Sequence, residues 1–363
     1  MHKLPFDLNL DDIDILKALS NANNKIGELN GLVKALPNPN IILNAVILGE
    51  AKESSEIENI VTTYDRIFKE ITLKTKDAPS NEVVNYRQAI LHGFKLLNDN
   101  GFISTNMLVE IHRIIEPSVG DIRKIPGTVI LNTKTNEILH TPPQNESKIR
   151  EYLSNLEKYI NYPELENADP LIKMGLIHFQ FESIHSFHDG NGRVGRILNI
   201  LYLVLEHKIN IPILFLSKYI NAHKKEYYDH LNMMQKDLSN YKKYIIYMLK
   251  AVNEMSQYTI NFINKMLNCI DNAKNIVIEK LPKIYSQELI DYLFYNFYTK
   301  NEYLRNNLNI SRNTASKYLH SLSKIGILIE EKVGKEIIYK NSYLYDLIKT
   351  WWRRRGEDKW QFY

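Results

Sequence analysis

The chain has 363 residues, of which 44% are hydrophobic, and 46 Lys and Arg residues against 42 Asp and Glu residues give a net charge of +4. This length allows two or three domains with substantial cores, and the composition is typical of a globular protein rather than a disordered one. One cysteine, Cys269, excludes an intramolecular disulfide and favours a cytoplasmic location. The N-terminus lacks a signal-like apolar run, and the apolar stretch Ile197 to Leu205 is too short to span a membrane and indicates a core helix.

Helices are expected over the first third of the chain. Apolar residues recur at helical spacing over residues 8–35, where the sequence predicts a first helix. Pro37 and Pro39 are expected to interrupt it, and a further helix is expected to follow Glu53. Residues 82–115 predict two helices separated by a glycine-containing stop between Asn98 and Ser104.

A β-like pattern replaces the helical one between Arg123 and Pro143. Apolar runs at 128–131 and 137–139 flank the turn-like residues 132–136, so the sequence predicts a small hairpin. From the residues alone, the hairpin could be a simple surface feature.

The twelve residues from His185 to Arg196 read HSFHDGNGRVGR and precede an apolar helical run. Gly190, Asn191 and Gly192 can bring backbone N–H groups close to an anion, and the helix that opens after them adds its positive dipole end. The segment therefore predicts a phosphate-binding site.

Four side chains of this segment add chemistry to the turn. Arg193 and Arg196 are three residues apart, so on a helix they project to one side. Asp189 is an oxygen ligand suited to Mg²⁺, and His185 could accept a proton from a hydroxyl. Zinc is an alternative because His188 lies close by, but no further clustered His or Cys completes four ligands. An ordinary loop before a solvated helix is the other alternative.

The C-terminal part has a different order of elements. Helices are expected over 289–297, over 300–307 and from Ser311 to about Lys324, followed by β-like runs at 327–329 and 337–339. This order suggests a winged helix-turn-helix, which binds DNA in some proteins and serves docking or dimerisation in others. The candidate DNA-binding residues are Arg312, Asn313, Ser316 and Lys317 at the major groove, with Lys332 and Lys335 on the wing and Trp351 to Arg355 as a further contact or a cap.

The segment from His185 to Arg196 resembles the Fic motif, His-x-Phe-x-(Asp/Glu)-Gly-Asn-Gly-Arg-x-x-Arg, at every fixed position. Residues 178–184 also resemble the helix before that motif, whereas Ser186 replaces a common proline. The resemblance implies a mainly α protein, a Fic-type helical bundle with a small β-hairpin flap, plus a C-terminal winged helix-turn-helix domain. The expected divisions are an N-terminal helical region with an inhibitory motif (1–80), a Fic catalytic core (81–235), a helical connector (236–285), and the winged helix domain and tail (286–363).

The activity implied by the resemblance is protein adenylylation, the transfer of AMP from ATP to a Ser, Thr or Tyr hydroxyl. His185 would deprotonate the hydroxyl, Phe187 would anchor the loop in the core, and Asp189 would hold Mg²⁺. The phosphate-binding segment would comprise Gly190, Asn191, Gly192, Arg193, Val194, Gly195 and Arg196, with Arg193 at the β-phosphate side and Arg196 at the γ-phosphate. Related kinases carry a lysine at the position of Gly192, and its absence favours AMP transfer.

Two further parts of the family's machinery have counterparts in this sequence. The hairpin would be the flap that holds the target segment by strand addition. Residues 216–220 and 227–231 resemble the segment that lines the nucleotide pocket, and Tyr228 would contact adenine or ribose. Tyrosines at helical spacing are more often core residues, so a packing role for Tyr228 is the alternative.

An inhibitory pattern, (Ser/Thr)-x-x-x-Glu-(Gly/Asn), fits Ser54, Glu58 and Asn59. In relatives with this pattern the glutamate pairs with the second motif arginine, so the implied pair is Glu58 with Arg196. A carboxylate on the guanidinium competes with phosphate for the same donors. By itself the pattern also describes an ordinary helix start with a capping interaction.

Two other functions are compatible with the same residues. One is a DNA-binding regulator whose Fic unit senses nucleotide or modifies itself, and the other is removal of AMP from a modified target, with Glu58 orienting water. The expected partners are ATP and a protein target, which could be the chain itself, with DNA as a candidate partner of the C-terminal domain. A homodimer is expected and a membrane partner is not.

Overall fold

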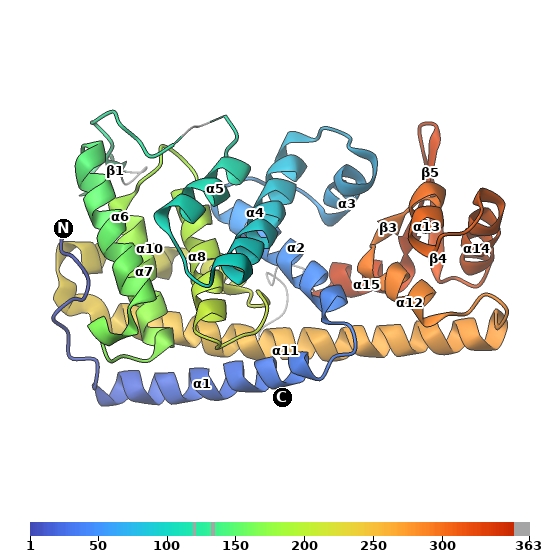
Figure 1. Cartoon of the computed structure of the whole chain (residues 1–363), viewed down its shortest axis with the longest axis horizontal. Coiled ribbons are helices and arrows are strands. Elements are labelled where there is room, and N and C mark those ends of the chain that lie inside the picture. The colour runs from blue at the N-terminus through green and yellow to red at the C-terminus, as the bar shows by residue number, and fades with distance from the viewer. Residues whose placement is uncertain (119–120, 132–134, 352–363) are drawn as a thin grey trace. The chain divides into compact units, whose positions relative to one another are not determined.

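A computed structural model describes residues 1–118, 121–131 and 135–351 of the chain (Figure 1). The chain forms two compact units. The larger unit contains Met1–Leu36, Val46–Thr63 and Asp77–Thr259, and the smaller unit contains Pro37–Ala45, Tyr64–Lys76 and the chain from Ile260 onward. Along the chain, segments of the two units therefore alternate up to Lys76. Asp77–Thr259 then belongs to the larger unit, and the chain from Ile260 onward to the smaller one.

The larger unit is almost entirely helical. Its helices are α1 (Ile13–Lys34), α4 (Ala78–Asn100), α5 (Thr105–Ile115), α6 (Glu146–Asn161), α7 (Pro170–Ile184), α8 (Asn191–Leu205), α9 (Leu216–Ala222) and α10 (Lys224–Lys236), with short 3-10 turns at Pro163–Leu165 and Leu238–Asn240. Two long helices have residues in both units, α2 (Pro39–Ile57) and α11 (Tyr241–Lys280).

Helices α7 and α8 form the centre of the larger unit (Figure 1). Both are almost fully buried, as is expected for helices that neighbours surround. Helices α4 and α5 also pack against α8. The prediction of a core helix over Ile197 to Leu205 is confirmed, and the packing holds the loop between α7 and α8 in a fixed place.

The first predicted helix is confirmed as α1, which Asp12 caps by accepting a hydrogen bond from the Asp14 N–H at 2.9 Å. The predicted break at Pro37 and Pro39 is confirmed, because α1 ends at Lys34 and α2 begins at Pro39, a first helical position that needs no N–H donor. The helix expected to follow Glu53 is wrong. Helix α2 then ends at Ile57, so Ser54 lies in its last turn and no helix follows Glu53 as a new element.

The two helices expected over residues 82–115 are confirmed as α4 and α5. Gly101 ends α4 with a left-handed φ of 76°, and the Ser104 hydroxyl caps α5 by accepting a hydrogen bond from the Met107 N–H at 3.2 Å.

The predicted hairpin is confirmed as two short antiparallel strands, β1 (Ile130–Leu131) and β2 (Ile138–His140), with Ile130 opposite His140. Of its predicted turn, residues 132–134 lie outside the described residues.

The smaller unit combines helices with a three-stranded sheet. Its other helices are α3 (Tyr64–Leu73), α12 (Gln287–Tyr295), α13 (Asn301–Leu308), α14 (Arg312–Lys324) and α15 (Ser342–Trp351), and its strands are β3 (Tyr298–Thr299), β4 (Leu328–Val333) and β5 (Glu336–Asn341). The sheet is antiparallel in the order β3–β5–β4. The three predicted helices and two predicted strands are confirmed, and Ser311 caps α14 as expected. Residues 352–355 of the predicted tail contact lie outside the described residues.

None of the helices in these described ranges combines the length and the apolar character needed to cross a bilayer.

Candidate active site

The loop from His185 to Gly190 joins the two central helices. His185 ends α7 in the left-handed region (φ 48°), and its N–H donates to the Phe181 carbonyl at 3.1 Å. Gly190 is also left-handed (φ 79°), and α8 begins at the next residue. A left-handed conformation is uncommon for a residue with a side chain, and such residues concentrate at functional sites.

Asn191 closes this loop from the start of α8. Its side chain accepts a hydrogen bond from the Phe187 N–H at 2.9 Å and donates one to the Phe187 carbonyl at 2.8 Å. The first helical bond runs from Val194 N–H to the Gly190 carbonyl, so the N–H groups of residues 191–193 lie outside the helical ladder. Asn191 therefore offers its backbone, and not its side chain, to an anion.

Helix α5 supports the loop through His112, a residue that the sequence did not predict. The buried His112 ring stacks on Phe187, with centroids 3.8 Å apart and planes 4° from parallel. Its Nε2 donates to the Asp189 carbonyl at 2.9 Å. His112 lies 77 residues upstream of Asp189 and outside any motif, so only its place among the apolar residues of a helix signalled burial.

Carboxylates surround the first motif arginine, Arg193, which is 2% exposed. Its guanidinium lies 3.1 Å from Glu82 and 3.9 Å from Asp189, and it donates to Glu116 one turn beyond His112. A buried charge requires such partners, and they fix the direction of the guanidinium. Neither glutamate belongs to the motif, so the sequence did not predict them as site residues.

The His185 imidazole is largely enclosed. Burial lowers its pKa to about 4, and the neighbouring charges of Arg123 and His140 act in the same direction. The ring is therefore neutral near physiological pH, which is the form that can accept a proton.

Arg123, another residue that the sequence analysis missed, holds the backbone around His185. Its Nε donates to the His185 carbonyl at 2.7 Å, and its backbone N–H donates to the Ser186 carbonyl at 3.0 Å. His140 on β2 donates to the Ser183 carbonyl at 2.9 Å, which ties the hairpin to the end of α7.

The carboxylate of Asp189 points outward, with a side chain 73% exposed. Its Oδ1 accepts a hydrogen bond from the Gly190 N–H at 2.6 Å. Across the part of the chain that the structure describes, no group of three or more His, Cys, Asp or Glu side chains could hold a metal ion. The donor set at Asp189 is thus one carboxylate beside free backbone N–H groups, which suits a cation that arrives with phosphates.

The second motif arginine, Arg196, is 1% exposed and paired with the segment after α2. Its Nη2 lies 2.8 Å from Glu58 Oε1, and its Nε donates to the Ser54 hydroxyl at 2.8 Å. Burial by itself would lower the pKa of Arg196, but the Glu58 carboxylate raises it above its ordinary value.

Two backbone features let Glu58 reach this position. A Cβ at Gly192 would lie 2.7 Å from Glu58 Oε1, so the absence of a side chain there admits the carboxylate. Asn59 adopts φ 65°, a left-handed conformation that Gly and Asn tolerate best, and it turns the chain directly after Glu58.

Helix α9 and the start of α10 hold the end of α2 on the larger unit. Asn221 donates to Glu53 at 2.8 Å and to Glu56 at 3.3 Å, and Lys224 donates to the Ile57 carbonyl. We call these contacts the α9 clasp; its side chains are Ser217, which binds the buried Glu50, and Lys218, Asn221 and Lys224.

The two neighbouring tyrosines at the start of α10 have different environments. Tyr227 is 2% exposed and hydrogen-bonds to His178 Nε2 at 2.7 Å, whereas Tyr228 is 38% exposed. Desolvation and then the Glu58 charge raise the pKa of Tyr228 to about 12. Glu182, on α7, lies in the same area, and burial raises the pKa of its carboxyl to about 7. Val194, in the first turn of α8, is fully buried.

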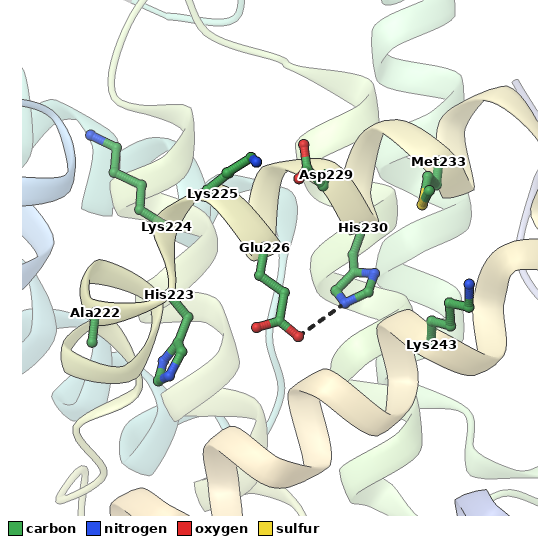
Figure 2. A pocket seen from close by; sticks show the side chains of 9 residues that line it. All are labelled: Ala222, His223, Lys224, Lys225, Glu226, Asp229, His230, Met233 and Lys243. Atoms are coloured by element: carbon green, nitrogen blue, oxygen red, sulfur yellow. Dashed lines mark hydrogen bonds and ion pairs between the residues drawn. The ribbon is translucent and has the colours of Figure 1, made fainter. Parts of the chain in front are cut away.

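A separate open hollow runs along the start of α10 (Figure 2). Glu226 and His230, one turn apart on α10, form a hydrogen bond of 3.4 Å beside it, and Lys224 and Lys225 point outward from its rim. No residue of the motif lines it, so the candidate site is the loop and not this hollow.

The residues considered for DNA contact lie on one helix of the smaller unit. Arg312, Asn313, Ser316 and Lys317 are exposed on α14. The Ser316 hydroxyl accepts a hydrogen bond from Asn301 at 2.8 Å, so it is partly engaged within the unit.

Three family models match this chain in succession. They are described as the Fic/DOC family N-terminal (residues 16–95), the Fic/DOC family (residues 102–203) and the C-terminal domain of SoFic-like protein adenylyltransferases (residues 269–344).

Curated relatives and a solved structure agree with these models. The protein adenylyltransferase Fic of Culex quinquefasciatus is 27% identical over 154 residues, which are 42% of this chain and 29% of that protein. The protein adenylyltransferase fic-1 of Caenorhabditis elegans is 25% identical over 203 residues, 55% of this chain and 37% of the relative. The chain thus spans well under half the length of the curated relatives it matches. The crystal structure of a Fic family protein from Desulfovibrio desulfuricans G20 superposes with a TM-score of 0.58 at 16% identity, over 94% of this chain and 98% of the other, which shows a shared fold. From its three matching models, its relatives and its fold, the chain belongs to the Fic/DOC family.

Proposed function

We propose that the chain is a protein adenylyltransferase that transfers AMP from ATP to a Ser, Thr or Tyr hydroxyl of a protein. The observation that carries this proposal is the loop between α7 and α8, where a neutral His185 lies beside a glycine turn and free N–H groups at a helix start. The names of the relatives support the same reaction.

The reaction follows from the chemistry of these groups. His185 accepts the proton of the target hydroxyl, whose oxygen then attacks the α-phosphorus of ATP. The bond between that phosphorus and the bridging oxygen breaks, and pyrophosphate leaves with the electron pair. The N–H groups of residues 191–193 and the start of α8 bind phosphate oxygens, and Arg193 steadies the β-phosphate side.

Magnesium fits the donors present at the loop. Asp189 offers an exposed carboxylate next to the phosphate-binding N–H groups, and Mg²⁺ in nucleotide sites takes one or two carboxylates plus phosphate oxygens. The ion would neutralise phosphate charge when bound, and Asp189 would be its protein ligand.

The hairpin β1–β2 is the proposed holder of the target segment. Its strands are short and carry exposed apolar side chains, Leu131 and Ile138, and His140 ties it to the end of α7 two residues before His185. Main-chain pairing with an added strand would bring a hydroxyl to the imidazole without demanding one target sequence. Tyr228, exposed close to Glu58, is the proposed contact for adenine or ribose.

Glu58 is the proposed brake on this reaction. Its carboxylate occupies Arg196, the donor assigned to the γ-phosphate, and a displacement of a phosphate by about 1 Å can lower a rate roughly a hundredfold. ATP that binds beside this ion pair would present its α-phosphate out of line for attack.

Incubation with Mg²⁺ and α-labelled ATP tests the function directly. Self-labelling is expected to rise by roughly tenfold or more in Glu58→Gly and to be absent in the double variant that adds His185→Ala. Glu58→Gly that is folded but no more labelled than the parent would contradict the brake. Label that persists without His185 would contradict the proposed base.

We also propose a winged helix-turn-helix, with DNA as its partner, for the C-terminal residues. The support is the order α12–β3–α13–α14–β4–β5 with a sheet ordered β3–β5–β4, and the exposed basic residues Arg312 and Lys317 on the second helix of the turn. A cytoplasmic location and a homodimer remain predictions from the sequence.

A further inference from the structure

The segment that carries the brake is bounded on both sides by pieces of the other unit. Residues Val46–Thr63, which include Ser54 and Glu58, belong to the larger unit. The segments immediately before and after them, Pro37–Ala45 and Tyr64–Lys76, belong to the smaller unit. If either flank moves with the smaller unit, the covalent chain transmits that movement to the brake segment, Val46–Thr63.

The smaller unit holds the second flank, α3, through a network of charges. The Asp65 carboxylate accepts hydrogen bonds from the Tyr298 hydroxyl at 2.6 Å and from Lys340 at 2.8 Å. Lys69 lies 2.8 Å from both Asp65 and Glu331. Although burial opposes it, the hydrogen bonds from Lys340, Lys69 and Tyr298 lower the pKa of Asp65 to about 2, which indicates a strongly bound carboxylate.

Apolar and backbone contacts reinforce this hold. Phe68 stacks on Phe297, with centroids 4.4 Å apart and planes 15° from parallel, and both rings are buried. The Tyr303 hydroxyl donates to the Thr72 carbonyl at 3.0 Å, so α13 also contacts the end of α3. Strands β3, β4 and β5 and helix α13 thus all supply partners to α3.

The first flank is held by α12. Asn38 donates to the Asp291 carboxylate at 3.2 Å, and Asn44 donates to the Tyr295 carbonyl at 2.7 Å. Helix α2 runs unbroken from Pro39 to Ile57, so its hydrogen-bonded backbone can transmit a displacement along its axis. After Glu58 only residues 59–63 separate the brake from α3, and such a short link leaves little slack.

We propose that the smaller unit is the control element of the transferase, and that a change in its hold on α3 or on the start of α2 shifts Glu58 on or off Arg196. This inference rests on the braking role proposed for Glu58. It assigns the C-terminal elements a function in regulating AMP transfer, whichever partner they bind.

Loosening the hold at α3 tests this coupling in the full-length chain. Asp65→Asn weakens the ion pairs to Lys340 and Lys69 but keeps the size of the side chain. Self-labelling is expected to rise by roughly three- to tenfold with Glu58 present and to stay within about twofold in a Glu58→Gly background, because the coupling acts through the brake. Glu288→Gln, which makes the same carboxylate-to-amide change at an exposed residue of α12, is the matched control and should change neither rate.

Asn44→Ala provides an independent test on the other flank, where the donor is exposed and its loss should not threaten folding. It should act in the same direction as Asp65→Asn. The coupling is wrong if both folded variants leave the rate unchanged, or if they raise it equally with and without Glu58.

Hydrogen exchange separates this inference from the function on which it rests. Amides of residues 54–58 should exchange several-fold faster in Asp65→Asn than in the parent, whether or not label is transferred. Faster exchange without any labelling in Glu58→Gly would contradict the proposed function alone. Unchanged exchange beside a strongly labelled Glu58→Gly would contradict the coupling alone.

Discussion

At His185, burial selects the protonation state that catalysis needs. Because burial lowers the pKa of this imidazole from 6.5 to about 4, the ring stays neutral at pH values where an ordinary histidine begins to charge. In the Glu58→Gly background, the transfer rate should therefore be nearly flat across neutral pH and should fall only as the pH drops toward about 4, where the base becomes protonated. Initial rates of self-labelling measured against pH test this, and a half-maximal rate near 6.5 would contradict it.

His112 should act as a positioning residue, because it touches Phe187 and the Asp189 carbonyl rather than the reacting atoms. His112→Phe keeps a ring to stack on Phe187 but loses the donor to Asp189, which leaves a part-buried carbonyl without this partner at a cost of about 1 kcal/mol. The transfer rate in the Glu58→Gly background should fall by about tenfold or more.

The apparent affinity for magnesium in the same variant gives a second readout. A shift of the Asp189 backbone also displaces its carboxylate, the proposed magnesium ligand. The midpoint of the magnesium dependence should rise together with the loss of rate. His92→Phe, on an exposed part of α4, is the matched control and should be neutral. A His112→Phe variant with parental rate and parental magnesium dependence would limit His112 to packing.

At the level of elements, the α9 clasp should set how firmly α2 stays on the larger unit. Asn221→Ala removes two hydrogen bonds to α2, and Lys224→Met removes the donor to its last carbonyl. Each change is expected to raise self-labelling by roughly two- to fivefold, because a hydrogen bond to a charged group contributes about 1 kcal/mol or more. Lys225→Met is the control, because Lys225 points outward (Figure 2), whereas its neighbour Lys224 bonds to α2.

Epistasis with the brake distinguishes this effect from a general change in activity. In Glu58→Gly, loosening α2 should add nothing further to the rate. A rise of equal size in both backgrounds would show that the clasp acts on the active site by another route.

The sequence predicted most of these elements and the catalytic loop, because periodicity and turn residues are local signals. Helices α1, α4, α5, α12, α13 and α14, the hairpin and the strands β4 and β5 all lie where apolar spacing and capping residues placed them. The error at α2 concerns its start: the helix expected after Glu53 begins already at Pro39, because proline fits a first helical position as well as a break. Strand β3 is two residues long, too short for a periodic signal.

The supporting parts of the site could not be predicted in this way. Glu82 and Glu116 contact Arg193, and Arg123 contacts the loop, across long separations in sequence. Each is an ordinary residue of its own segment until the fold brings it there. The pairing of Ser54 with Arg196 spans 142 residues. Family resemblance could suggest Glu58 as the partner of Arg196, but the carboxylates around Arg193 required three-dimensional contacts.

Over the whole molecule, net charge is distributed unevenly. Residues 298–340 contain eight Lys and Arg against four Asp and Glu, a balance of +4 that equals the total of 46 minus 42 for the chain. The remainder is therefore neutral overall. Within the C-terminal segment, Glu331 and Lys340 form an ion pair, whereas Arg312 and Lys317 are exposed on α14. Because the basic excess is confined to residues 298–340, it favours an anionic partner for the smaller unit.

Binding of duplex DNA by the full-length chain tests this reading through its salt dependence. Affinity should fall steeply as salt rises, because each neutralised phosphate releases counterions. Arg312→Ala and Lys317→Ala should each weaken binding and reduce the slope of log affinity against log salt by about 0.9. Lys225→Ala, a surface lysine of the larger unit, should leave both quantities unchanged. If no DNA binding is detected even at low salt, DNA is not the partner of this unit. The exposed face of α14 then serves docking or dimerisation instead.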